Sequence, residues 1–365
     1  MEKVYYLGGG DMSDDKVYRC ENCGGIMEFD VKTQTLKCPN CETSIQIEND
    51  NSLVVEHDLT LDSKRIVKAT EKQSKTMQCS GCGASIEIGA NDTAAKCPYC
   101  DSSYVLAERQ EETIIPDGVV PFKIDKNQAL LDFRNWMGKR WLAPNELKKL
   151  YQHGGFQSIY IPYWTFDAQA DCHYTADGGR EREVKYKDEN GEEKTKIEVD
   201  WYHTSGHVSK FFDDIQVPAS STHEKKFFDG IMPFNLDQVA SYSPKYISGN
   251  LSENYSVSLE DGHKEAVSEM NSELRSMASS DVLKRYDRVR DVRISPRYSN
   301  ETYKYLLLPV YSVAYNYKDK VYNVMINGQT GKVKGDYPYS KLKITILVII
   351  AIIIIAGIAY FMSQN

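Results

Sequence analysis

The sequence of 365 residues lacks the short motifs that mark the commonest enzyme active sites. It contains no HExxH, no GxSxG and no dinucleotide-binding glycine fingerprint, and nothing in it pairs two carboxylates for acid–base work. It also lacks an excess of positive charge, because 44 basic residues stand against 52 acidic ones and the formal net charge is −8. An acidic chain repels nucleic-acid phosphates unless basic residues cluster locally. We therefore expect a protein that is not an enzyme.

The first twenty residues contain no apolar run of the signal-peptide type, whereas the C-terminal region contains 19 successive uncharged residues at 344–362. A helix of that length spans about 28 Å, close to the roughly 30 Å hydrocarbon core of a bilayer. Lys341 and Lys343 precede the run and no basic residue follows it. The positive-inside rule then places the N-terminal bulk in the cytoplasm. We predict a single-pass, tail-anchored cell-membrane protein that contacts lipid through 344–362; a buried core helix is the alternative.

Eight of the nine cysteines fall into four CxxC pairs, and the pairs form two sets. Fourteen residues separate the pairs within each set, and each cysteine of the second set lies 59 residues after its counterpart in the first. The intervening segments align without a gap, so the two sets form an internal repeat. The predicted metal ligands are Cys20, Cys23, Cys38 and Cys41 in the first set and Cys79, Cys82, Cys97 and Cys100 in the second.

Each set has the spacing of a four-cysteine zinc ribbon, in which two tight turns present four thiolates to one ion at roughly 2.3 Å. Gly24 and Gly83 follow the second cysteine of a pair, where a residue that tolerates positive φ is favoured. Pro39 and Pro98 stiffen the other turn. Because every ligand is a protein sulfur, we predict two separate structural zinc ions. Iron in a rubredoxin-like site has the same ligands and stays open, whereas disulfides conflict with the predicted cytoplasmic placement.

Three further features resemble functional sites and are interpreted as structural. Cys172 precedes His173, and adjacent residues on a strand point to opposite faces, so we expect a buried thiol and no catalytic pair. His203 and His207 lie roughly 13 Å apart if they share a strand, which is too far for one metal. The sequence GQTGK at 328–332 lacks the glycine spacing and the Ser/Thr of a phosphate-binding loop, so we interpret it as a turn between strands.

The predicted domain organisation is a loose N-terminus at 1–14, zinc ribbon one at 15–48, a linker at 49–75, zinc ribbon two at 76–107, a connector at 108–118, a cytoplasmic α+β domain at 119–340 and a membrane anchor at 341–365. Within the main domain, hydrophobic periodicity and turn signals predict an antiparallel-sheet-rich fold with a few helices. The helices are expected at 125–141, 145–152 and 265–286, the strands at 158–175 and 202–217, a hairpin at 180–201 and a meander at 289–337.

Two helices carry apolar residues at helical spacing. Leu130, Phe133, Met137 and Trp141 share one face of the first, and Asp125 with Gln128 resembles a capping box. In the third helix the apolar positions are Val267, Met270, Leu274 and Met277. We expect the four tryptophans, Trp136, Trp141, Trp164 and Trp201, to lie in the core.

The ordered motifs resemble a group of Firmicute membrane proteins with TFIIB-type zinc ribbons. They are the CxxC…CPxC repeats, IP…VPF at 115–122, RWxxP at 140–144, IYIPYWTFDA at 159–168, PVY at 309–311, NGQTGKV at 327–333 and the C-terminal span. Such proteins are encoded near phage-shock-protein A homologues and SPFH (flotillin-like) proteins. The resemblance implies a membrane-stress complex in which these proteins, or a related zinc-ribbon membrane protein, are partners. It implies no catalytic residues.

Two functions remain after these exclusions, with an enzymatic main domain as a third for which the sequence offers no constellation. The first is a membrane-anchored adaptor that recruits or scaffolds cytoplasmic partners in an envelope-stress complex. The second is nucleic-acid binding through the ribbons, which requires basic, aromatic-bearing faces. Ribbon one has four basic and four acidic residues between 16 and 47, and ribbon two has Lys96 against three acids between 76 and 106. The sequence therefore favours the adaptor.

Overall fold

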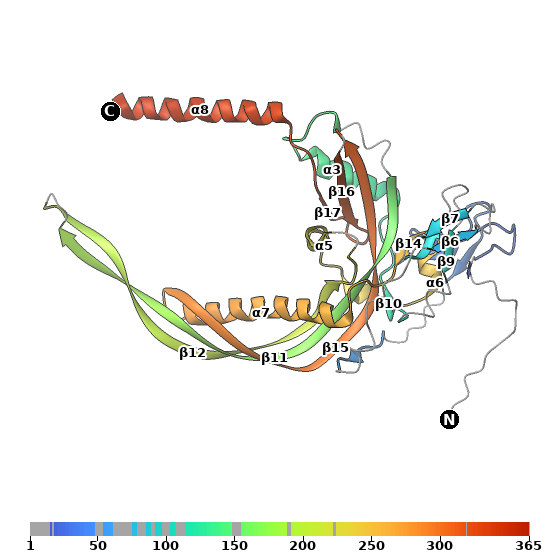
Figure 1. Cartoon of the computed structure of the whole chain (residues 1–365), viewed down its shortest axis with the longest axis horizontal. Helices are drawn as coiled ribbons and strands as arrows, with labels where there is room; N and C mark the ends of the chain where they lie inside the picture. The colour runs from blue at the N-terminus through green and yellow to red at the C-terminus, as the bar shows by residue number, and fades with distance from the viewer. Residues whose placement is uncertain are drawn as a thin grey trace.

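Figure 1 shows a computed structural model of the chain, which combines a large twisted sheet with helices on both of its faces. The structure describes residues 15–16, 18–47, 54–60, 75–78, 85–88, 92–96, 103–106, 114–147, 155–187, 191–221, 224–318 and 320–364. It is a mixed, sheet-rich fold with a few helices, which agrees with the predicted α+β class in outline.

Two unusually long strands form the centre of the fold. Strand β11 (Gly155–Lys187) pairs antiparallel with β15 (Arg288–Tyr317), from Gly155 opposite Ala314 to Gly179 opposite Arg288. Strand β12 (Glu193–Pro218) pairs along the other edge of β11. The predicted strands 158–175 and 202–217 and the predicted hairpin 180–201 are thus parts of one continuous hairpin. Gly191 adopts φ +79° beside its turn, as the Asn-Gly signal requires.

Nine further strands in the described part of the chain extend this sheet at the end of β11 opposite its hairpin with β12. Most of the pairs are antiparallel. Two pairs are parallel, β10 with β15 and β14 with β11, so the sheet is mixed rather than purely antiparallel. The additional strands are β1 (Asp15–Lys16), β5 (His57–Asp58), β8 (Asp92–Lys96), β9 (Ser103–Leu106), β10 (Gly118–Val119), β13 (Ala240–Ser241), β14 (Leu251–Glu253), β16 (Lys320–Asn327) and β17 (Val333–Gly335).

The burial of β11 changes along its length and divides the molecule into a body and an arm. Residues 159–168 are all buried, because ribbon one and α3 (Lys126–Gly138) cover one face and α5 (Lys225–Ile231) covers the other. From 170 to 176 buried and exposed residues alternate, as expected when one face meets solvent. The C-terminal half of β11 forms an arm with β12 and the N-terminal half of β15, and this arm extends away from the body (Figure 1). The arm has three strands as far as Gly179, opposite Arg288, and continues beyond it as the hairpin of β11 and β12.

Helix α7 (Leu259–Leu283) lies along the arm and covers its buried face (Figure 1). Its buried residues recur every four positions at Ala266, Met270, Leu274, Ala278 and Val282, and they pack on Cys172, Tyr174 and neighbouring arm residues. A Cβ on Gly262 would come within 2.7 Å of the Trp164 ring, so glycine permits the close approach of the helix to the sheet here. The helix begins six residues earlier than the predicted 265–286, capped by the Ser258 side chain.

Helix α3 confirms the predicted cap and corrects the predicted end. The Asp125 carboxylate accepts a hydrogen bond from the Gln128 amide, but the Gln128 side chain turns to Asp132 and does not complete the capping box. The helix ends at Gly138, so the expectation of a helix through Trp141 is wrong. Trp141 is 60% exposed and does not belong to the core, whereas Trp164 is fully buried. The predicted helix 145–152 lies partly outside the described residues.

Among the described residues, three short helical elements were not predicted: α5, η1 (Leu236–Gln238) and α6 (Pro244–Ile247). They are too short to show a hydrophobic period in the sequence. The GQTGK segment at 328–332 forms a turn between β16 and β17, as interpreted. The buried Asn327 side chain accepts the Gln329 and Thr330 amides, and Gly331 adopts φ +75°.

Helix α7 provides a test of the arm. Leu274→Ala removes a fully buried side chain and should lower the free energy of unfolding by about 2–5 kcal/mol. Leu283→Ala on the same helix removes a side chain that is 47% exposed, and it should change the free energy of unfolding by about 0.5 kcal/mol or less. Urea unfolding of the full chain in detergent micelles, followed by tryptophan fluorescence, measures both. Equal losses for the two variants would show that α7 does not pack on the arm in this register.

Candidate metal centre

The first two CxxC pairs form two turns with the same backbone hydrogen bonds. In the first turn, the Gly24 amide donates to the Cys20 carbonyl at 2.8 Å and the Cys20 amide donates to the Gly25 carbonyl at 2.7 Å. In the second turn, the Glu42 amide donates to the Cys38 carbonyl at 3.0 Å, and the Cys38 amide donates to the Thr43 carbonyl at 2.9 Å. Gly24 has φ +72°, which confirms the prediction from its place after the second cysteine; Glu42 has φ +61° at the equivalent position.

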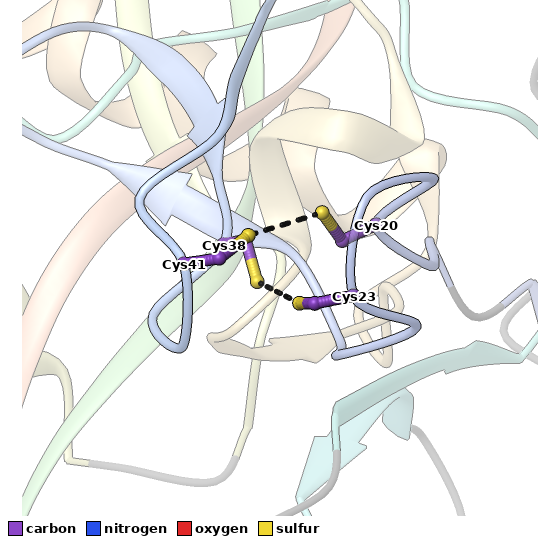
Figure 2. Close-up of side chains that lie close together, drawn as sticks. All are labelled: Cys20, Cys23, Cys38 and Cys41. Carbon is purple, nitrogen blue, oxygen red and sulfur yellow. Dashed lines mark hydrogen bonds between the residues drawn. The ribbon is translucent and has the colours of Figure 1, made fainter.

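These turns bring the four predicted ligands of ribbon one together (Figure 2). The Cys20 and Cys41 sulfurs are 3.5 Å apart, as are those of Cys23 and Cys38, and all four lie within 4.8 Å of one another. Four sulfurs bound tetrahedrally at roughly 2.3 Å from zinc lie about 3.8 Å apart. The four thiols therefore fit one tetrahedral ion, and they come from one local ribbon.

The thiols have different surroundings. Cys20 and Cys38 are buried, Cys41 is half-buried and Cys23 is exposed. The hydroxyl of Thr43 lies 3.2 Å from the Cys41 sulfur and lowers the pKa of Cys41 to about 6. At Cys23 the backbone of Gly25 lowers the pKa, but the thiols of Cys41 and Cys38 outweigh it and raise the pKa to about 12. Four thiols this close cannot all ionise by themselves, and a divalent cation favours the ionised form of each.

The chemistry of the donor set determines what a metal would do here. Four cysteines occupy the tetrahedral positions and leave none for water, which is the pattern of a structural zinc site. Zinc held by Cys20, Cys23, Cys38 and Cys41 would cross-link the two turns.

Ribbon one packs against the body. It contains the small sheet β2 (Glu28–Asp30), β3 (Thr35–Lys37) and β4 (Ser44–Gln46). The buried strand residues Phe29 and Leu36, together with Met27 directly before β2, belong to the same core cluster as α3. The Phe29 ring lies 5.5 Å from that of Tyr246 on α6.

Polar contacts hold the same face of ribbon one to the body. The Phe29 amide donates to the Ser248 carbonyl at 2.9 Å, and the Ser248 hydroxyl donates to the Met27 carbonyl at 2.9 Å. The Gln34 side chain reaches the Phe122 carbonyl at 2.9 Å. The ribbon is therefore a docked part of the core.

The second set, Cys79, Cys82, Cys97 and Cys100, lies outside the described residues, so a second metal site remains a prediction. The strands that flank these cysteines are described. Strand β6 (Lys75–Gln78) pairs antiparallel with β7 (Ser85–Ile88), and β8 pairs with β9, so each CxxC pair falls between two paired strands. Cys38 and Cys41 fall in the same way between β3 and β4. Strand β8 also pairs with β14, which joins this segment to the main sheet.

A second acidic group, Asp167, Asp213 and Asp214, is explained by a lysine. The Lys304 ammonium lies 2.7 Å from Asp214, 2.9 Å from Glu56 and 4.0 Å from Asp167. Burial lowers the pKa of Lys304, but the hydrogen bonds to Asp214 and Glu56 outweigh it and hold the pKa above its usual value. A protein cation thus lies beside two of these three carboxylates, those of Asp167 and Asp214, and we do not assign a metal to the group.

The structure also describes the three other candidates, Cys172, His203 and His207. Cys172 is fully buried under α7, while His173 is exposed on the other face of β11. His203 and His207 both lie on β12, 3.3 Å from Asp177 and 3.6 Å from Asp171 respectively. Neither joins a metal cluster within the described part of the chain.

Thr43 is the contributor to the site that the sequence interpretation missed. The sequence contains a signal for this role, because Ser102 takes the place of Thr43 in the second copy of the repeat. Each hydroxyl residue stands two positions after the last cysteine of its set. A hydroxyl in both copies is suited to donate to a thiolate. Ser102 lies outside the described residues.

Comparisons with known proteins give one informative similarity. The chain is 28% identical over 330 residues to a protein of Bacillus subtilis (strain 168) described as "Uncharacterized protein YdjG". The match covers 90% of this chain and 91% of that protein, and it is consistent with the resemblance to Firmicute proteins. No family model matches the chain, and no solved structure matches it.

Removal of one ligand tests the metal centre. The full chain should bind two zinc ions, and Cys38→Ser should leave one, because each predicted site closes its own loop. Because ribbon one belongs to the same core cluster as α3, the variant should also have a lower free energy of unfolding. Elemental analysis by mass spectrometry after gel filtration measures the zinc.

Cys172→Ser is the matched control, because this buried thiol lies outside the cluster. It should keep both ions. Loss of both ions from Cys38→Ser would mean that the two sites exchange ligands, and an unchanged zinc content would remove Cys38 from the ligand set.

Proposed function

We propose that this protein is a membrane-anchored zinc-ribbon adaptor that recruits cytoplasmic partners to the bacterial cell membrane in an envelope-stress complex. The observation that supports this most strongly is α8 (Lys341–Gln364), a helix long and apolar enough to span a membrane. None of its apolar residues is buried against the rest of the described structure. In Figure 1 it projects from the body by itself. So large an apolar surface requires a lipid or protein environment.

The charges on ribbon one favour protein recruitment over nucleic-acid binding. Three lysines on or beside the ribbon are paired with carboxylates: Lys32 with Asp125 at 3.3 Å, Lys37 with Glu42 at 3.7 Å, and Lys96 with Glu28 at 3.1 Å. A face whose cations are compensated in this way attracts phosphates weakly.

The packing of ribbon one leaves its outer strand exposed, and we propose that this strand is the surface for a partner. The β3 residue Leu36 is buried against the body, whereas Ile45, its neighbour on β4, is 39% exposed. All three residues of β4 are exposed, and β4 pairs with β3 alone within the described residues. An edge strand with an exposed apolar side chain offers backbone hydrogen bonds and a hydrophobic contact to a partner.

Tethering would contribute to recruitment without adding contacts, because confinement at the membrane raises the effective concentration of a membrane-bound partner. The adaptor role therefore requires α8 as well as ribbon one. No catalytic chemistry is part of the proposal.

Deletion of 344–362 tests the tether. We expect the protein to move from the membrane to the soluble fraction and to lose its partners. The measurement is affinity purification from detergent-solubilised native membranes, with and without nuclease, followed by mass spectrometry. Nuclease-resistant recovery of SPFH-type or phage-shock-type proteins with the full chain supports the adaptor. Recovery that survives the deletion excludes the tether role, and purely nuclease-sensitive recovery favours the nucleic-acid hypothesis.

Ile45→Asp tests the outer strand of ribbon one. This substitution should keep zinc, because Ile45 is exposed and is not a ligand, but it should reduce partner recovery by about tenfold or more. Leu131→Asp is the control, since Leu131 is 48% exposed and belongs to α3, not to ribbon one. Equal recovery with Ile45→Asp and the wild type would place the recruiting surface elsewhere.

A further inference from the structure

The first turn of α8 is attached to the body at a defined place. The Lys343 ammonium donates to the carbonyls of Trp141 and Ala143 at 2.9 and 2.8 Å and to the Asn145 side chain at 2.8 Å. The Ser340 amide donates to the Leu142 carbonyl at 2.8 Å. These bonds hold the loop after α3 beside the point where the uncharged run begins.

If α8 spans a bilayer, these contacts set the depth of the neighbouring side chains. Ile344 enters the hydrocarbon, so residues level with Lys341 and Lys343 lie among the lipid headgroups. Trp141 is 60% exposed, Tyr339 56% and Leu342 72%. Trp and Tyr are the residues that favour this interfacial layer, where an apolar ring and a polar group are both accommodated.

A hollow of about 680 Å³ opens at this level, between the start of α8, the loop after α3 and the β15–β16 turn. Its lining includes four lysines: Lys318, Lys320, Lys341 and Lys343. Glu146 is the carboxylate among its described lining residues, and it accepts the Tyr317 hydroxyl at 3.0 Å. The β15–β16 turn also contains Asp319, which lies outside the described residues.

The charge of the hollow opposes that of the chain as a whole. Among the described lining residues, four lysines stand against one carboxylate, that of Glu146, on a chain whose net charge is −8. Within the described part of the chain, no carboxylate lies within 4.0 Å of the ammonium groups of Lys318, Lys320 or Lys341. The Lys318 ammonium lies 5.3 Å from the centre of the Tyr317 ring. Ammonium groups and tyrosine hydroxyls are donors suited to phosphate oxygens.

We propose that this hollow binds the phosphate-bearing headgroup of an anionic phospholipid. The inference rests on the proposed anchoring by α8 and adds a lipid specificity to it. The lysines supply the charge, the tyrosines line the walls, and the position beside the first turn of α8 brings a headgroup within reach while its acyl chains remain in the bilayer. The Lys343 ammonium already donates its hydrogen bonds to the loop after α3. The preference for anionic lipid therefore depends on Lys318, Lys320 and Lys341.

The test uses the full chain in neutral detergent with equimolar phosphatidylglycerol and phosphatidylcholine of the same acyl chains. Native mass spectrometry measures the lipid that each chain retains. The wild type should retain phosphatidylglycerol at least about tenfold better than phosphatidylcholine. The triple variant Lys318→Gln, Lys320→Gln, Lys341→Gln should lose that preference, because each juxtamembrane lysine contributes a severalfold attraction to anionic lipid.

The matched control is Lys185→Gln, Lys264→Gln, Lys284→Gln, which removes the same charge from exposed sites on the arm and α7. It should keep the preference, and both variants should keep their zinc. Equal retention of the two lipids by the wild type overturns the inference, whether or not the variants fold. Equal loss in both variants overturns it as well, since net charge would then explain the binding.

Two further arms separate the sources of failure. Displacement of phosphatidylglycerol by millimolar inorganic phosphate overturns the lipid assignment in favour of a soluble anion. Extraction of the wild type from phosphatidylcholine vesicles by alkaline carbonate overturns the proposed anchoring itself. Retention in those vesicles without lipid preference overturns only the headgroup site.

Discussion

The antiparallel pairing of β11 with β15 is the constraint on which the rest of the structure depends. The two strands are 33 and 30 residues long and pair through both the body and the arm. In the body, β11 residues are buried on both sides, so helices and ribbon one must cover both faces. In the arm, one face is exposed and α7 alone covers the other. Register shifts near Asp167 and Thr175 interrupt the ladder, and such bulges increase the twist of a strand pair. The curvature of the arm in Figure 1 agrees with this.

Ribbon one packs against that body, which gives it a source of stability besides any metal that it binds. A zinc ribbon is too small to bury a sufficient core, and a metal usually supplies the missing stability. Here Met27, Phe29 and Leu36 obtain a second source of stability by joining the core cluster of α3 and β11. The body therefore covers the docked face, whereas the two CxxC turns and β4 remain exposed. The orientation of any bound partner is then tied to the orientation of the body.

The body is in turn tied to the start of α8. The hydrogen bonds of Lys343 connect the uncharged run to the loop after α3, and the Arg140 guanidinium lies over the Trp136 and Tyr337 rings at 4.6 and 5.5 Å. The segment that leads into α8 is thus packed against the body before the apolar run begins. This coupling connects the metal centre, the sheet and the proposed membrane surface in one folded unit.

Features that depend on local spacing could be predicted from the sequence. The four-cysteine cluster of ribbon one, the positive φ of Gly24 and Gly191, the cap at Asp125 and the burial of Cys172 all follow from residues close together in the chain. Turn geometry and strand alternation operate over a few residues, so their signals are present in any short window. The outline of the fold, a mixed sheet with a few helices, followed from the same periodicities.

Other features were decided by contacts between distant segments. Trp141 continues the apolar stripe of α3 in the sequence, but the helix ends at Gly138 and the Trp141 side chain is 60% exposed. The parallel pairs of β10 and β14, the docking of ribbon one on Ser248 and the lysines gathered beside α8 join residues up to more than two hundred positions apart. Local propensity carries no information on which of many apolar faces will meet. Only the packing of the whole chain decides which apolar faces meet, because the burial of each side chain depends on all the segments that surround it.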